Sequence, residues 1–98
     1  MPYLIETFDK PAHLPLRLAT RDAHLRFLDE HKARLLACGA KLADHNDDAD
    51  GGVYMLDTED RAEAEAFIAA DPFSRAGLFE RVEIRRWRKA YFNGQSCL

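Results

Sequence analysis

The first residues of the chain alternate between two sides. Between Pro2 and Phe8, one side carries Tyr3, Ile5 and Thr7, and the other carries Leu4, Glu6 and Phe8. Period-two alternation among aromatic and β-branched residues predicts a strand over residues 2–8. Two prolines within residues 9–15 then predict a loop, because proline interrupts the interiors of both strands and helices.

Helical spacing follows this loop. The segment from Leu16 to Cys38 contains no glycine or proline, and five of its leucines fall within an arc of about 100° when each residue advances about 100°. These are Leu18, Leu25, Leu28, Leu35 and Leu36. The pattern predicts one long amphipathic helix over residues 16–38. Gly39 suits the left-handed position after the helix end, and residues 40–43 are predicted to start a short strand.

The middle of the chain predicts a hairpin and a second helix. The acidic, turn-rich segment Asp44–Gly52 is typical of a long loop, and the short apolar run Val53–Leu56 after it predicts a buried strand. Asp60 followed by Glu63 resembles a capping box at a helix start. The alanine-rich residues 62–70 therefore predict a helix, which the proline two residues later ends.

Alternating residues 79–87 predict a final strand, and residues 89–98 are predicted to form a C-terminal tail. The order β-α-β-β-α-β predicts an α+β, ferredoxin-like fold, in which two helices cover one face of a four-stranded antiparallel sheet. Because 98 residues suffice for one modest core, we expect a single domain over residues 1–98. Apolar residues on both sides of the first strand predict a cover for the free face, which a second subunit in a homodimer would supply.

The charge balance argues against a nucleic-acid partner. The chain has 14 Lys and Arg against 17 Asp and Glu, a formal net charge of −3, whereas phosphate-binding proteins usually carry a positive excess. The basic run Arg85–Lys89 is therefore interpreted as the solvated face of an edge strand. No apolar run approaches the roughly 18 residues of a membrane helix or the roughly 7 to 15 of a signal-peptide core. We expect a cytoplasmic protein with no membrane partner.

No metal site is expected. Cys38 and Cys97 are far apart, fit no metal-ligand spacing and are interpreted as free thiols. No two of the four histidines have the HxxxH spacing of a helical zinc site. Residues 46–57 come near a calcium loop, but its first residue is Asn46 and its twelfth, Asp57, is shorter than the usual glutamate. A solvated acidic hairpin tip is the favoured interpretation of this loop.

Three candidate catalytic or binding side chains share one stripe of the first predicted helix: Arg17, Arg21 and His24. A partly shielded, neutral imidazole can act as a general base near pH 7, and a carboxylate would hold it in place. Asp71, at the end of the second predicted helix, is the candidate carboxylate. Each residue also has a structural interpretation: a packed histidine, a helix-terminating aspartate, and solvated arginines that pair with nearby acids.

These residues lie in two motifs that resemble the YciI-like family of YCII-related domain proteins. The first motif is Arg17-Leu18-x-x-Arg21-x-Ala23-His24-Leu25, and the second is Asp71-Pro72-Phe73-x-x-Ala76-Gly77-Leu78-Phe79-Glu80. The resemblance spans nearly the whole chain and implies a small dimeric α/β barrel with the ferredoxin-like fold. It also implies that His24 and Asp71 meet in a cleft as a catalytic dyad. Where the family often has Gly-Pro after the long helix, this chain has Gly39 followed by Ala40.

The resemblance extends to muconolactone isomerases and dehydrochlorinases, which implies proton transfer on small cyclic or aromatic-derived molecules. We therefore expect a homodimeric enzyme in which His24 is the general acid or base and Asp71 steadies the imidazole. Arg17 or Arg21 would attract an anionic group of a small-molecule ligand, and Phe73 would line the pocket. Such chemistry needs no metal, nucleotide or redox cofactor. The alternative is a non-catalytic module for small-ligand binding or dimerisation.

Overall fold

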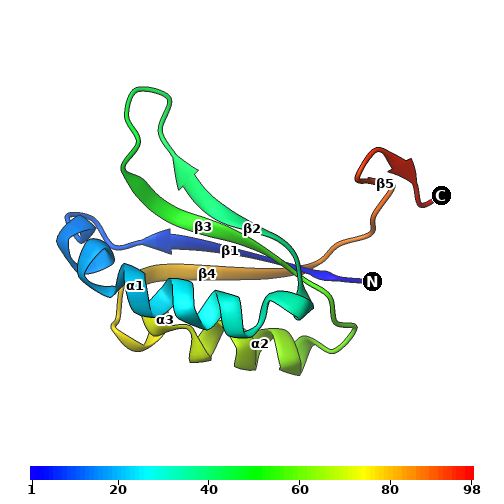
Figure 1. Cartoon of the computed structure of the whole chain (residues 1–98), viewed down its shortest axis with the longest axis horizontal. Coiled ribbons are helices and arrows are strands. Elements are labelled where there is room, and N and C mark those ends of the chain that lie inside the picture. The colour runs from blue at the N-terminus through cyan, green and yellow to red at the C-terminus, as the bar shows by residue number, and fades with distance from the viewer.

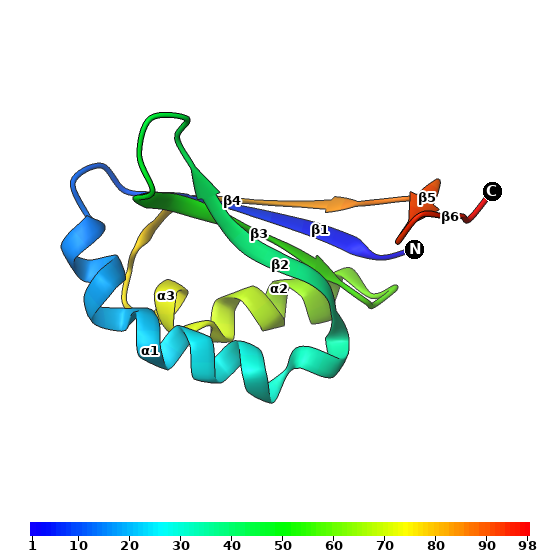
Figure 2. The same ribbon diagram turned by 45° about the horizontal axis from the view of Figure 1, so that its top comes forward.

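In the computed structural model, which describes all 98 residues, β1 (Tyr3–Asp9) lies inside a four-stranded antiparallel sheet of order β2-β3-β1-β4. β1 pairs with β3 (Ala49–Leu56) on one side and with β4 (Phe79–Arg86) on the other. β2 (Leu35–Leu42) is the edge strand beyond β3. All helices lie against one face of the sheet (Figures 1 and 2). The predicted α+β, ferredoxin-like fold is confirmed.

The alternation of β1 decides which residues enter the core. Tyr3, Ile5 and Thr7 are buried beneath the helices, whereas the residues between them are half-buried on the opposite face. Tyr3 and Ile5 belong to a hydrophobic cluster that β3 and α2 (Arg61–Ala70) complete with Tyr54, Leu56, Ala64, Phe67 and Ile68. The strand thus supplies one layer of the core and places Leu4 and Phe8 on the face of the sheet that no helix covers.

The predicted helix over residues 16–38 is wrong in its extent. α1 runs from Leu14 to Glu30 and holds Pro15 in its first turn, where the missing N–H has no helical partner to lose. A short 3₁₀ turn, η1 (Lys32–Arg34), then leads the chain into β2. Leu35 fits the helical arc, yet it pairs with Leu56 of β3. Pairing between distant segments outweighs local periodicity here.

β2 also differs from its predicted position. Gly39 lies inside the strand, opposite Val53, and does not occupy a left-handed position after a helix. The predicted strand at residues 40–43 corresponds to the second half of β2. Cys38 pairs with the buried Tyr54, so the thiol of Cys38 is on the helix-covered side of the sheet.

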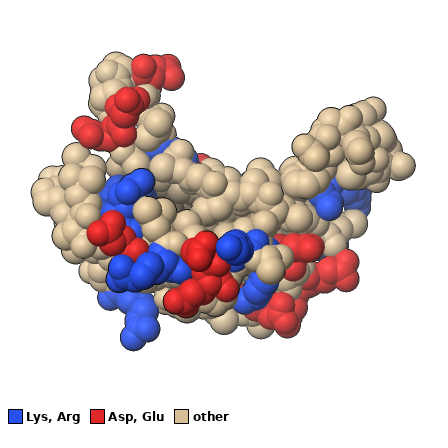
Figure 3. Space-filling view, viewed as in Figure 1, with Lys and Arg blue, Asp and Glu red and all other residues tan.

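The candidate calcium loop at residues 46–57 does not form, because most of it belongs to the paired strand β3. β3 begins at Ala49, and Gly51 and Gly52 pair with β1. A Cβ at Gly51 would overlap the backbone oxygen of Thr7, so glycine lets the two strands approach this closely. Residues 44–48, between β2 and β3, form an exposed hairpin tip whose acidic side chains are seen at the top of Figure 3.

The second half of the molecule follows its prediction closely. Asp60 accepts the backbone N–H of Ala62 and caps α2. A short helix, α3 (Pro72–Arg75), follows directly. Beyond β4, the predicted tail contains a small hairpin of β5 (Tyr91–Phe92) and β6 (Gln95–Ser96) that projects from the body (Figure 1). None of the helices has both the length and the apolar character needed to cross a membrane.

Candidate functional site

A buried carboxylate joins the helices to the sheet. Asp71 caps α3 by accepting the backbone N–H of Phe73 at 2.8 Å. The same carboxylate accepts the hydroxyl of Tyr54 at 2.9 Å and Nδ1 of His24 at 2.9 Å. Asp71 is fully buried, and an ionised carboxylate can only accept, so three converging donors keep its charge inside the core. Both sequence interpretations of Asp71, helix terminus and histidine partner, therefore hold at once.

His24 is held by contacts on two sides. Its Nδ1 lies 2.9 Å from both oxygens of Asp71, and because the carboxylate only accepts, Nδ1 carries a proton. The imidazole also stacks on the ring of Phe73, with centroids 3.9 Å apart and an interplanar angle of 16°. These contacts fix the tautomer and leave Nε2 without a protein partner. That nitrogen is the one available to a ligand.

Tyr54 is a site residue that the sequence analysis missed. It lies in the apolar run that predicted β3, and its hydroxyl is one of the three donors to Asp71. Burial, followed by the negative charge of Asp71, raises the pKa of Tyr54 far above its ordinary value. The hydroxyl therefore stays protonated and keeps donating. The available signal was a tyrosine inside a predicted buried strand, because a buried tyrosine needs a hydrogen-bond partner.

Arg17 is already neutralised inside the protein. Its Nε donates to Oδ2 of Asp9 at 2.6 Å and one Nη donates to Oδ1 at 3.3 Å, with both side chains less than 10% exposed. The guanidinium also lies over the ring of Phe73, 4.6 Å from its centroid. Arg17 therefore ties the end of β1 to α1 and supports the ring on which His24 stacks.

Arg21 differs from Arg17, although it lies one turn further along the same helix. It is exposed and makes no ion pair or side-chain hydrogen bond with the rest of the chain. It lines the same cavity as His24. Of the two arginines proposed to attract an anion, Arg21 is the one whose charge is not neutralised within the protein.

The site opens into a small cavity of about 220 Å³ between α1 and the strands β2 and β3. Its lining includes Arg17, Arg21, His24, Leu25, Leu28, Cys38, Gly39, Ala40, Gly51, Gly52, Tyr54 and Phe73. A cavity of about 150 Å³ is enough to hold benzene, so this one has room for a single substituted ring. A second hollow of about 210 Å³ adjoins it at Arg21 and reaches the acidic hairpin tip.

Cys38 places a thiol in this cavity. Desolvation, followed by the charge of Asp71, raises the pKa of Cys38 to about 11. The thiol is consequently protonated near neutral pH and is a weak nucleophile there. Cys38 and Cys97 form no disulfide, and although Cys38 as a residue is exposed, its thiol is partly desolvated where it lines the cavity. No group of three or more His, Cys, Asp or Glu side chains is arranged to hold a metal ion.

Comparisons with known proteins agree with this fold. The family model described as YCII-related domain matches residues 1–88. The protein YciI of Escherichia coli O6:H1 is 34% identical, over 93% of this chain and all of the relative. An uncharacterized protein of Haemophilus influenzae is 30% identical over the same shares.

Two solved structures extend the comparison. The 5-chloro-2-hydroxyhydroquinone dehydrochlorinase TftG of Burkholderia phenoliruptrix AC1100, in complex with 2,5-dihydroxybenzoquinone, superposes with a TM-score of 0.85 at 32% identity. That match covers 90% of this chain and 94% of TftG. An antibiotic biosynthesis monooxygenase, at 17% identity and a TM-score of 0.50 over 91% of this chain and its whole length, shares the fold alone.

The different situations of the two arginines predict different effects on stability. Arg17→Gln leaves the Asp9 carboxylate buried without its partner, and we expect a loss of about 3 kcal/mol in the free energy of unfolding. Arg21→Gln removes an exposed charge, and we expect a change of less than about 0.5 kcal/mol. Urea denaturation of the two variants measures both values. Equal losses would contradict the assigned division between them.

The raised pKa of Cys38 predicts slow alkylation. In Cys97→Ser, where Cys38 is the single thiol, a pKa of about 11 against an ordinary 9.0 leaves roughly a hundredfold less thiolate at pH 8. Each thiolate is more basic and therefore about tenfold more reactive, which offsets part of this loss. Iodoacetamide should thus alkylate the folded variant about tenfold more slowly than the urea-unfolded variant.

Two features separate the raised pKa of Cys38, caused by desolvation and then by the charge of Asp71, from simple obstruction of the thiol. The rate for the folded protein should keep rising with pH above 9.0, and Asp71→Asn should accelerate it, because the charge that opposes ionisation is gone. Mass spectrometry measures the alkylation rates. Equal rates for the folded and the unfolded protein at pH 8 would show that the thiol of Cys38 has an ordinary pKa.

Proposed function

The chain belongs to the YCII-related domain family, and from this membership and the buried His24–Asp71 pair we propose that it is a cofactor-independent enzyme of small-molecule metabolism. The reaction is an isomerisation or elimination on a small, anionic, ring-containing molecule. His24 acts as general base or acid, and Asp71 fixes its tautomer and stabilises the imidazolium form. The exposed thiols suit a reducing compartment such as the cytoplasm.

The observation that carries this proposal is the direction in which His24 is held. Asp71 occupies Nδ1, and Nε2 has no protein partner in a residue that lines the cavity. A neutral imidazole in this tautomer takes a proton at Nε2 and becomes a cation beside a buried carboxylate. It can then return the proton to another atom of the same molecule, or to a leaving group, with no other co-reactant.

The other residues of the cavity favour a planar, anionic substrate. Arg21 offers an unpaired positive charge in the cavity lining, and the ring of Phe73 stacks on the imidazole of His24. The volume of about 220 Å³ suits a single substituted ring. TftG, whose name describes a dehydrochlorinase and whose structure holds 2,5-dihydroxybenzoquinone, is similar to 90% of this chain. Hydroxylated or chlorinated six-membered rings are therefore the first substrates to try.

We further propose that the protein works as a homodimer through the open face of its sheet. On that face Leu4 of β1, Met55 of β3 and Ala37 of β2 form one row across three strands. Phe8 lies further along β1, beyond Glu6, with Lys41 and Arg81 over its ring. Leu4, Phe8 and Met55 are half-buried rather than covered. A second copy of the same face would remove this row from water.

The enzyme proposal predicts a specific loss of turnover. With 5-chloro-2-hydroxyhydroquinone as probe and chloride release as the readout, His24→Gln should reduce kcat by about 10² to 10⁴-fold, because it removes the base. Asp71→Asn should also reduce kcat, because the amide no longer stabilises the imidazolium. His45→Gln, in the exposed hairpin tip, is the matched control and should retain activity. Circular dichroism checks that each variant folds.

Binding without turnover would contradict this proposal. If calorimetry shows that the wild-type protein binds hydroxylated aromatic probes but no product is released, the non-catalytic ligand-binding module is the better description.

Arg21→Gln should raise KM more than it lowers kcat, since the contact of Arg21 with the anionic group of the substrate forms already in the ground state.

The dimer proposal predicts that one charge on the open face separates the subunits. Met55→Glu places a carboxylate in the middle of the apolar row, and we expect a shift from dimer to monomer in analytical ultracentrifugation. Ala69→Glu, exposed on α2 at the opposite side of the molecule, should leave the mass unchanged. A wild-type monomer at micromolar concentration would contradict the proposal.

A further inference from the structure

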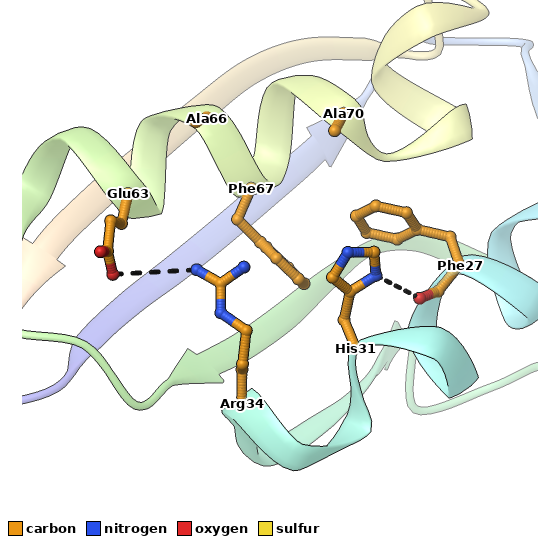
Figure 4. A pocket seen from close by; sticks show the side chains of 7 residues that line it. All are labelled: Phe27, His31, Arg34, Glu63, Ala66, Phe67 and Ala70. Carbon is orange, nitrogen blue, oxygen red and sulfur yellow. Dashed lines mark hydrogen bonds and ion pairs between the residues drawn. The ribbon is translucent and has the colours of Figure 1, made fainter.

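A separate groove lies between the C-terminal end of α1 and α2, away from both hollows at Arg21 (Figure 4). Its volume is about 410 Å³, and it shares no residue with the His24 cavity. Phe27 forms an aromatic wall and the buried Phe67 lies at the base of the groove, while Ala66 and Ala70 leave room along α2. Ligand sites are typically concave, mostly apolar and equipped with a few polar groups, and this groove has such a lining.

Arg34 is the polar group with the most unused capacity. Its side chain makes no hydrogen bond, and the nearest carboxylate oxygen, Oε2 of Glu63, lies 3.9 Å from Nη2. That oxygen already accepts the hydroxyl of Thr58 at 2.5 Å. The guanidinium lies over the ring of Phe67, 5.6 Å from its centroid. It therefore points planar donors into the groove with only a long, solvent-exposed ion pair to satisfy them.

His31 and Phe27 complete the wall opposite Arg34. Nδ1 of His31 donates to the backbone oxygen of Phe27 at 2.9 Å, which leaves Nε2 without a protein partner. The imidazole packs 4.5 Å from the ring of Phe27 and 5.7 Å from the ring of Phe67. The two phenylalanine rings are themselves 5.1 Å apart. Because Phe67 is buried, a flat ring entering the groove would meet the half-buried rings of Phe27 and His31.

We propose that this groove is a second binding site, for a small aromatic carboxylate. The carboxylate binds the fork of Arg34 in place of Glu63, because a guanidinium matches a carboxylate with two parallel hydrogen bonds. The ring of the ligand lies against Phe27 and the imidazole of His31, above the alanines of α2, and Nε2 of His31 accepts from a ring hydroxyl when one is present. This site is independent of the function proposed for His24.

The test uses benzoate as probe and ¹⁵N-labelled protein. We expect saturable chemical-shift changes at the Nε–H of Arg34 and at the backbone amides of Ala66 and Ala70. Arg34→Gln should weaken binding about tenfold or more, because it removes a charge-assisted contact. Glu63→Gln should strengthen binding, since the competing carboxylate is gone. Benzyl alcohol, which has the ring without the charge, should cause no saturable change at Arg34.

Arg21→Gln separates the groove from the His24 cavity. If benzoate binds in the groove, the affinity read from the signals of Arg34, Ala66 and Ala70 should be the same in this variant as in the wild type, whether or not the protein is an enzyme. Shifts confined to residues of the His24 cavity and lost in Arg21→Gln would overturn the proposal. So would equal affinities of Arg34→Gln and the wild type, or no saturable shift at millimolar benzoate.

Discussion

A charge inside a protein core has to be surrounded by donors, and in this chain that requirement falls on Asp71. Its carboxylate collects one donor from α1, one from β3 and one from the backbone of α3. The packing of α1 and α3 onto the sheet is therefore coordinated by one side chain with no solvent exposure. The same contacts that satisfy the charge also orient the imidazole of His24, so structure and candidate chemistry depend on one residue.

The sequence was sufficient for the pieces whose signals are local. The alternation of β1, the cap at Asp60 and the stop after α2 each depend on neighbouring residues, and the structure has them as predicted. The end of α1 was mispredicted, because Leu35 satisfies helical spacing and strand pairing equally well. Only contact with β3, a segment far along the chain, decides between them, and no local pattern contains that information.

The candidate site shows the same division. His24 and Asp71 were identifiable from a helix stripe and a helix end, because both positions are marked by sequence. The use of Arg17 could not be inferred, since its partner Asp9 lies in a segment predicted to be a loop. Tyr54 was hidden inside an apolar run. Its ring also contacts Phe67, with centroids 6.2 Å apart, so the aromatic base of the groove at Arg34 adjoins the residue that supports Asp71.

The sheet order has a consequence for how the protein is made. β1 lies between β3 and β4, so during synthesis it emerges from the ribosome before either of the strands that pair with it. Its apolar side chains have no sheet partner until residue 56 is out, and the fourth strand closes only after residue 86. His24 likewise waits for Asp71, which is 47 residues later. The long-range pairing of the central strand therefore governs when this chain can fold.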